Sequence, residues 1–223
     1  MADLVRVERR EAIALGPLHA PVSRNGSMQG ARAGLKAVRN LCGKSPAGAW
    51  AVLAGAGGTL PTGDDLTETA GMDEAGFAAM IEGFQMITVA LRAMTMPVIA
   101  AIEGYAVGGG LEIAAACDLR VCAADTIFFC PEVRLGLLMS NGSSSILPRL
   151  IGSGRTRELM LAGRRFDAAW AERAGLVNRA APSGEVLAAA MAVANEGAAN
   201  PPAGAQRPKP RPNRAREGPG AGA

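Results

Sequence analysis

Residues 97–112, Pro-Val-Ile-Ala-Ala-Ile-Glu-Gly-Tyr-Ala-Val-Gly-Gly-Gly-Leu-Glu, join a strand to a helix through a cluster of glycines. The apolar run 98–102 predicts a buried strand, and the run that starts at Gly109 predicts a helix. A helix that begins in glycine backbone presents its first N–H groups at the positive end of the helix dipole, where they can hold an anionic oxygen. Glu112 lies one turn inside this helix, close to whatever those N–H groups bind.

A second carboxylate, Glu132, follows in the segment Phe129-Cys130-Pro131-Glu132. Oxyanion donors together with two carboxylates can stabilise and protonate an enolate. Both features also have a plainer explanation. The glycines 108–110 can serve close packing of a helix on a strand, and a glutamate after proline can be a surface turn residue. The helix around Glu112 is otherwise apolar, which favours a buried carboxylate there.

Strand and helix patterns alternate along the chain, which predicts an α/β fold with parallel strand pairing. The predicted strands are 5–9, 12–18, 50–54, 98–102, 119–123 and a short one near Phe128. The predicted helices are 28–42, 73–94, one from Gly109, 144–150, 155–162, 168–174 and 184–195. We expect Gly16 and Pro17 to interrupt the second strand, because proline cannot donate to a central ladder.

The chain divides into a predicted core domain, residues 1–199, and a tail, residues 200–223, that is rich in proline, arginine and glycine. Proline at that density forbids helix and predicts an extended, disordered segment. The net charge of the 223 residues is +3, and the tail alone carries about +4. The core domain is therefore slightly acidic, which argues against a nucleic-acid-binding surface.

We expect neither a targeting signal nor a metal site. We expect no apolar stretch long and uncharged enough to span a bilayer, and the N-terminus lacks the apolar core of a secretory signal. The cysteines show no metal-ligand spacing; they are Cys42, Cys117, Cys122 and Cys130. We interpret them as buried, reduced side chains, with a Cys122–Cys130 disulfide as the less favoured alternative. We therefore predict a cytoplasmic protein without a metal site.

The segments around the two glutamates resemble the crotonase family, and within it the enoyl-CoA hydratases. The residues that carry the resemblance are 101–112, 116–120 and 129–136, with further similarity in 52–58, 63–66, 147–152 and 174–177. The resemblance implies a crotonase-type spiral of ββα turns and a homotrimer or hexamer. Members of the family continue with further helices where the proline-rich tail begins here, so the C-terminal helical part is expected to be truncated.

The resemblance also implies roles for individual residues. The backbone N–H groups of Thr62 and Gly109 would hold the thioester oxygen. Glu112 would orient and activate water, and Glu132 would exchange a proton at the α-carbon. Coenzyme A would be part of the substrate, and no separate cofactor or metal is expected. The other residues expected to bind the acyl-CoA are Arg24, Gly63, Asp64, Asp65, Leu66, Tyr105, Gly108 and Pro131.

The predicted activity is the reversible hydration of a 2-enoyl-CoA thioester to a 3-hydroxyacyl-CoA. Retention of both glutamates favours a hydratase over relatives that keep only one. Two alternatives stay open, an enoyl-CoA isomerase and a catalytically silent acyl-CoA-binding protein. The isomerase is the near alternative within the family. The missing C-terminal helices and the altered loop Leu60-Pro61-Thr62 favour the silent protein, and the segment 140–145 also departs from the family pattern.

Overall fold

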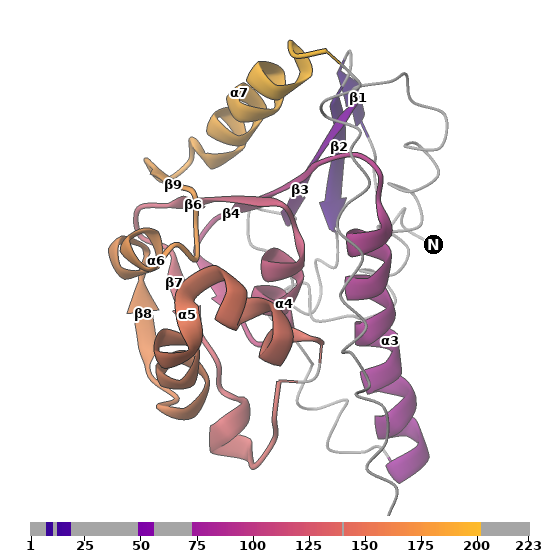
Figure 1. Cartoon of the computed structure of the whole chain (residues 1–223), viewed down its shortest axis with the longest axis vertical. Helices are drawn as coiled ribbons and strands as arrows, with labels where there is room; N and C mark the ends of the chain where they lie inside the picture. Colours follow the sequence, from indigo (N-terminus) through magenta and orange to yellow (C-terminus); the bar gives the residue numbers. More distant parts are fainter. Residues whose placement is uncertain (1–7, 11–12, 19–48, 56–72, 140, 202–223) are drawn as a thin grey trace, which may run out of the picture.

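The computed structural model describes residues 8–10, 13–18, 49–55, 73–139 and 141–201 of the chain (Figure 1). These residues form an α/β fold with a six-stranded sheet, a three-stranded sheet and helices packed around them. The predicted α/β class with parallel pairing is therefore confirmed. The predicted helix 28–42 and the proline-rich tail beyond Pro201 lie outside the described residues.

The larger sheet has the strand order β1-β2-β3-β4-β6-β9. Its strands are β1 (Glu8–Arg10), β2 (Ile13–Leu18), β3 (Trp50–Gly55), β4 (Val98–Ile102), β6 (Leu119–Ala123) and β9 (Arg179–Ala181). The first two strands pair antiparallel, and the later pairings are parallel. Parallel strands buried on both faces are continuous apolar runs, as β4 is.

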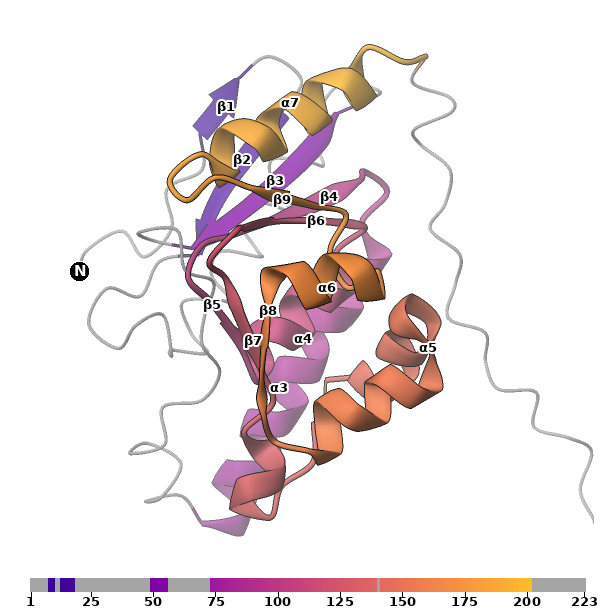
Figure 2. The same ribbon diagram turned by 90° about the vertical axis from the view of Figure 1, so that its left-hand side faces the viewer.

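Helices cover both faces of this sheet. Alternate residues of a strand point to opposite faces, and β4 shows this directly. Val98, Ala100 and Ile102 belong to the large core beneath the sheet, whereas Ile99 and Ala101 pack with helix α7 (Val186–Ala198). Among the helices that the structure describes, Figure 2 shows α7 on one side of the sheet and α3, α4, α5 and α6 on the other.

One expectation about β2 is wrong. Gly16 and Pro17 do not interrupt the strand, which runs to Leu18 and keeps its register with β3, where Pro17 lies opposite Ala54. The pairing with β1 covers residues 13–15, so the recorded partner of Pro17 is β3. Proline is tolerated where a strand has a ladder on one side, because the N–H that it lacks would have no strand partner on the other.

The smaller sheet positions the candidate site. It consists of β5 (Tyr105–Val107), β7 (Ile127–Phe129) and β8 (Arg165–Asp167) in the order β5-β7-β8. β5 and β7 are parallel, with Val107 opposite Phe129, and β8 runs antiparallel to β7. The short strand predicted near Phe128 is thus confirmed as β7.

Helix α3 (Glu74–Ala93) matches the predicted helix 73–94. Asp73 caps it by accepting a hydrogen bond from the N–H of Gly76 at 2.8 Å, and Ile87, Leu91 and Met94 are buried in the core. By length and composition alone this helix is long and apolar enough to cross a membrane, so the expectation that no stretch would qualify is wrong. The evidence for a membrane segment is weak, because a core helix passes the same test.

The later helices follow their predicted positions. Helix α5 (Ser143–Leu161) contains a non-helical residue, Gly152, with φ 78° and ψ 157°, so it bends between the two helices that the sequence predicts. Helix α6 (Ala168–Ala174) begins at Asp167, which accepts from the N–H of Trp170, and ends at Gly175 with φ 80°. Helix α7 begins slightly later than predicted.

Candidate active site

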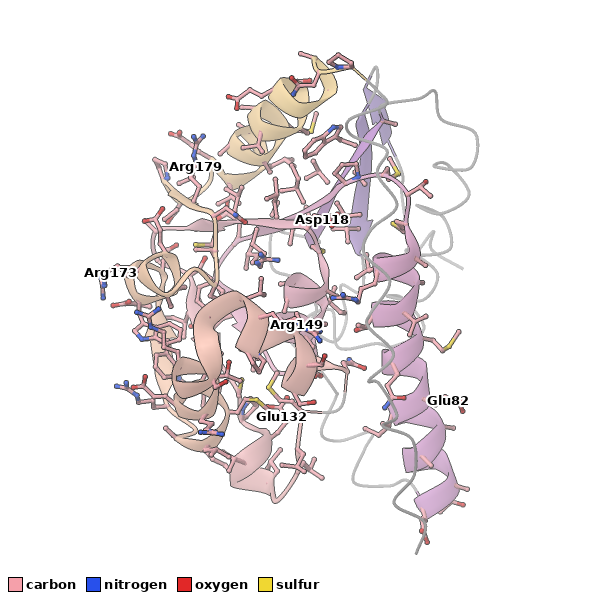
Figure 3. All side chains as sticks on the ribbon, in the orientation of Figure 1. Glu82, Asp118, Glu132, Arg149, Arg173 and Arg179 are labelled. Atoms are coloured by element: carbon pink, nitrogen blue, oxygen red, sulfur yellow. The ribbon has the colours of Figure 1, made fainter. Side chains whose placement is uncertain are left out.

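The parallel pairing of β5 with β7 brings the two glutamates to one edge of the smaller sheet. Because the carboxyl ends of parallel strands lie at the same edge, the residues that follow Val107 and Phe129 are neighbours. Helix α4 (Gly109–Ala116), which carries Glu112, follows the first strand. The 3₁₀ turn η1 (Glu132–Leu135) follows the second. Figure 3 shows Glu132 well below the main sheet, whereas Asp118 lies beside that sheet.

Gly108 makes the turn into α4. Its φ of 51° and ψ of −124° are essentially open to glycine alone, and its N–H donates to the carbonyl of Phe129 at 3.0 Å. The next amide, Gly109 N–H, is the first of the helix and has no hydrogen-bond partner among the residues that the structure describes. An available N–H at the positive end of a helix is suited to hold an oxyanion.

Glu112 is 3% exposed, in a helix whose other residues from Gly110 to Ala116 are also buried. Its Oε1 accepts two hydrogen bonds of 2.8 Å, from the N–H of Asn141 and from the hydroxyl of Ser143. These donors come from the start of α5 and fix the carboxylate from outside its own helix. The predicted burial of Glu112 is confirmed.

Glu132 begins the η1 turn and is half-buried, with its Oε2 atom enclosed. Its carbonyl accepts from the N–H of Leu137 at 2.9 Å, and Gly136, in the left-handed region with φ 70°, closes the turn. A tight turn therefore fixes the backbone of Glu132, and its side chain is not a fully exposed surface group. The residues that follow it in the turn, Val133, Arg134 and Leu135, are exposed.

Cys130 lies between β7 and η1 and is fully buried. Burial raises the pKa of its thiol, and the charges of Glu132 and Glu112 raise it further. Both carboxylates therefore disfavour the thiolate form of Cys130. A thiol with a raised pKa stays neutral at neutral pH, so Cys130 is not an activated nucleophile.

The remaining predicted site residues divide into two groups. Tyr105 on β5 is 49% exposed, which excludes a core-filling role, and Pro131 is half-buried beside Glu132. The predicted residues outside the described part of the chain are Arg24, Thr62, Gly63, Asp64, Asp65 and Leu66. The structure therefore brings Gly109, Glu112 and Glu132 together, and the second oxyanion donor stays a prediction.

Two residues that hold Glu112, Asn141 and Ser143, were missed by the sequence reasoning. The segment 140–145 drew attention only as a departure from the family pattern. A signal was present, because polar residues flank Gly142 at the start of a predicted helix. Which acid they would contact depends on how α5 packs against α4, and one sequence does not show that.

Other acidic groups have structural roles. Asp118 accepts from the N–H of Val98 at 2.7 Å, and Glu103 accepts from the N–H of Gly184 at 3.1 Å. Both acids thus hold backbone segments together. Among the described residues, no group of three or more histidine, cysteine, aspartate or glutamate side chains is placed to hold a metal ion.

The fold and the paired acids define an α/β protein with a candidate acid–base site at the ends of two parallel strands. The sequence model of the enoyl-CoA hydratase/isomerase family matches residues 8–217, so the chain belongs to this family. The family that the sequence motifs predict is thereby confirmed.

Curated relatives and solved structures agree with this family. A probable mitochondrial enoyl-CoA hydratase of Arabidopsis thaliana is 37% identical over 139 residues, which cover 62% of this chain and 46% of the relative. A probable enoyl-CoA hydratase of Mycobacterium tuberculosis is 39% identical over 143 residues, covering 64% and 55%. The matched region spans about half the length of these relatives.

Among solved structures, DspI of Pseudomonas aeruginosa superposes with a TM-score of 0.81 at 32% identity, covering 92% of this chain and 84% of DspI. An enoyl-CoA hydratase of Bacillus anthracis gives a TM-score of 0.81 at 28% identity, covering 92% and 80%. These neighbours confirm the crotonase fold.

Proposed function

We propose that this chain catalyses the reversible addition of water to a 2-enoyl-CoA thioester, giving a 3-hydroxyacyl-CoA. The observation that carries the proposal is the placement of Gly109 and Glu132 just after the ends of the parallel strands β5 and β7, with the buried Glu112 one turn into the helix that Gly109 begins. Membership of the enoyl-CoA hydratase/isomerase family supports the substrate class.

In the proposed reaction the thioester oxygen lies at Gly109 N–H. Addition of water at the β-carbon moves electrons through the double bond onto this oxygen, and the positive end of α4 stabilises the resulting charge. One such donor contributes about 3 kcal/mol to the transition state. The second donor would be Thr62 N–H.

The two glutamates divide the protons of the added water. Glu112, fixed by Asn141 and Ser143, would orient the water and take a proton from it as its oxygen bonds to the β-carbon. Glu132 would deliver a proton to the α-carbon. Two nearby carboxylates titrate as a coupled pair, so the resting pair would share its protons as a unit. Coenzyme A stays attached throughout, and no other cofactor enters.

The test is the hydration of crotonyl-CoA, followed by the loss of absorbance of the conjugated thioester. Wild type is compared with Glu132→Gln and with Glu82→Gln, an exposed acid on α3 outside the site (Figure 3). We expect Glu132→Gln to lower kcat about 10²–10⁴-fold, the usual contribution of a positioned acid or base. Glu82→Gln should retain the wild-type rate.

Other outcomes select the alternatives. Wild type that binds crotonyl-CoA without turnover would be a silent acyl-CoA-binding protein. Wild type that moves the double bond of a 3-enoyl-CoA but adds no water would be an isomerase.

Full activity in Glu132→Gln would show that the site is misplaced. Sedimentation of the same sample tests the proposed homotrimer or hexamer, and fractionation of cells tests the proposed cytoplasmic location.

A further inference from the structure

Two buried polar side chains near the candidate site have no hydrogen-bond partner among the described residues. Asn141 is 1% exposed, and neither its Oδ1 nor its Nδ2 is hydrogen-bonded within the described part of the chain. Thr88 of α3 is 5% exposed, and its Oγ1 is equally without a partner there. Buried amides and hydroxyls lose their hydration, so nearly all of them in folded proteins are paired. Unpaired groups of this kind indicate a ligand or an ordered water.

Asn141 lies close to Glu112, and Thr88 lies close to the residue after Asn141. The N–H of Asn141 is 2.8 Å from Glu112 Oε1, so covalent geometry keeps the Asn141 side-chain amide within about 7 Å of that oxygen. Thr88 Cγ2 is 3.8 Å from the place that a Cβ on Gly142 would occupy, and Gly142 is the residue after Asn141. Asn141 therefore borders the candidate site, and Thr88 of α3 lies beside the start of α5 next to it.

The chemistry of this corner selects a class of ligand. A carboxamide supplies one acceptor and two donors, and a threonine hydroxyl can do either. Both groups are uncharged, and Ile146 Cδ1 is also 3.8 Å from the same point on Gly142. A few neutral polar groups in an apolar wall suit a neutral ligand that itself donates and accepts hydrogen bonds.

We infer that Asn141 and Thr88 form a polar subsite for the acyl chain, and that the preferred thioester carries a neutral hydroxyl group a few bonds beyond its reacting carbons. This inference rests on the proposed function, because it takes Glu112 as the group that faces those carbons. A hydrocarbon chain at this place leaves the amide and the hydroxyl buried and unpaired. A site built to hydrogen-bond a substrate hydroxyl therefore rejects the analogue that lacks it.

The experiment measures binding, so it does not depend on turnover. Dissociation constants of hexanoyl-CoA and 5-hydroxyhexanoyl-CoA are determined by calorimetry for the full chain. We expect wild type to bind the hydroxylated thioester about tenfold more tightly, the effect of one well-formed hydrogen bond. Asn141→Leu and Thr88→Val should each remove most of this preference. Thr156→Val, which removes a buried hydroxyl from the second half of α5, should leave the ratio unchanged.

Four results would overturn the inference. Equal binding of the two thioesters by wild type is one, and a preference that survives in both Asn141→Leu and Thr88→Val is another. A higher melting temperature of Asn141→Leu with an unchanged ratio would assign the unpaired atoms to a buried water. A clear preference without hydration of crotonyl-CoA would retain the subsite and refute the proposed function. Failure to bind either thioester would refute both.

Discussion

The two ends of α4 use their polar groups in opposite ways. At the C-terminal end, Arg120 is 3% exposed and donates to the carbonyls of Leu176, Cys117 and Ala114 at 2.6, 2.8 and 3.4 Å. Burial lowers the pKa of Arg120, while Cys117 and Asp118 oppose that shift, and an arginine keeps its charge in proteins. A cation at this end also favours the negative pole of the helix.

At the N-terminal end of α4, hydrogen-bonding groups stay available. Gly109 N–H and the side chain of Asn141 have no partner in the described residues, and a carboxylate lies one turn into the helix. The comparison assigns stability to the C-terminal end of α4 and binding capacity to its N-terminal end, although the helix has only eight residues. Substitutions at the C-terminal end should unfold the protein, whereas substitutions at the N-terminal end should mainly inactivate it.

Glu112→Gln should produce the largest change in activity. Glutamine keeps an acceptor for Asn141 and Ser143 but cannot take a proton, so we expect kcat/KM with crotonyl-CoA to fall about 10²–10⁴-fold. The free energy of unfolding should change by less than about 1 kcal/mol, because both hydrogen bonds can form. Asp118→Asn is the matched change at the other end of α4. Normal turnover by Glu112→Gln would contradict the assignment of activity to the N-terminal end of α4 and of stability to its C-terminal end.

Arg120→Ala should produce the largest loss of stability. It leaves the carbonyls of Leu176 and Cys117 buried without their donor, which we expect to lower the free energy of unfolding by about 3 kcal/mol. Urea titration measures this change. The exposed Arg173 on α6 provides the control, and Arg173→Ala should stay within about 0.5 kcal/mol of wild type. Equal stability of the two variants would refute a structural role for Arg120.

Ser143→Ala should have a smaller effect on activity. Its hydroxyl gives Glu112 one of two observed hydrogen bonds, and a hydrogen bond to a charged group contributes about 1.5–3 kcal/mol. We expect kcat to fall about tenfold or more if that bond orients the catalytic carboxylate. The dependence of kcat on pH should shift as well, since the carboxylate loses a donor that favours its charged form. An unchanged pH profile with a lower melting temperature would reduce Ser143 to a packing role.

Alkaline pH should weaken the fold only gradually. Burial, then the charge of Glu172, raises the pKa of Cys122 to about 12, whereas an unfolded cysteine ionises near about 8.5. Below the unfolded value the neutral thiol carries no penalty; above it the unfolded state releases a proton that the folded state retains. Stability should therefore fall by up to about 1.4 kcal/mol per pH unit for Cys122 between these two values.

The variant Cys122→Ala isolates this contribution. Urea titrations at pH 8, 9 and 10 should give a shallower decline in the variant, with Cys130 still contributing because burial raises its pKa too. Parallel declines in wild type and variant would show that Cys122 does not retain its proton in the fold.

The sequence predicts the segments whose pattern is long or chemically unmistakable. The helical spacing from Asp73 to Met94 and the apolar run of β4 each match one element closely. The glycines before α4 locate the helix start, and the apolar neighbours of Glu112 indicate its burial. These features are local, so the residues themselves carry the information.

The sequence does not predict features that depend on distant contacts. Strands β5, β8 and β9 have three residues each, too few for a periodic pattern. The tolerance of β2 for Pro17 depends on where β1 stops pairing. The contacts of Asn141 and Ser143 with Glu112 join residues about thirty positions apart, and they arise only when α5 packs against α4.

Exchange of the α-protons of butyryl-CoA in deuterated water tests the central claim most directly. This saturated thioester cannot be hydrated. Exchange therefore reports only on stabilisation of the enolate at the N-terminal end of α4 and on the transfer of protons between the α-carbon and Glu132. The account predicts that wild type incorporates deuterium at the α-carbon and that Glu132→Gln does so at least about a hundredfold more slowly. Wild type that binds butyryl-CoA without exchange, or equal exchange in both proteins, would contradict it.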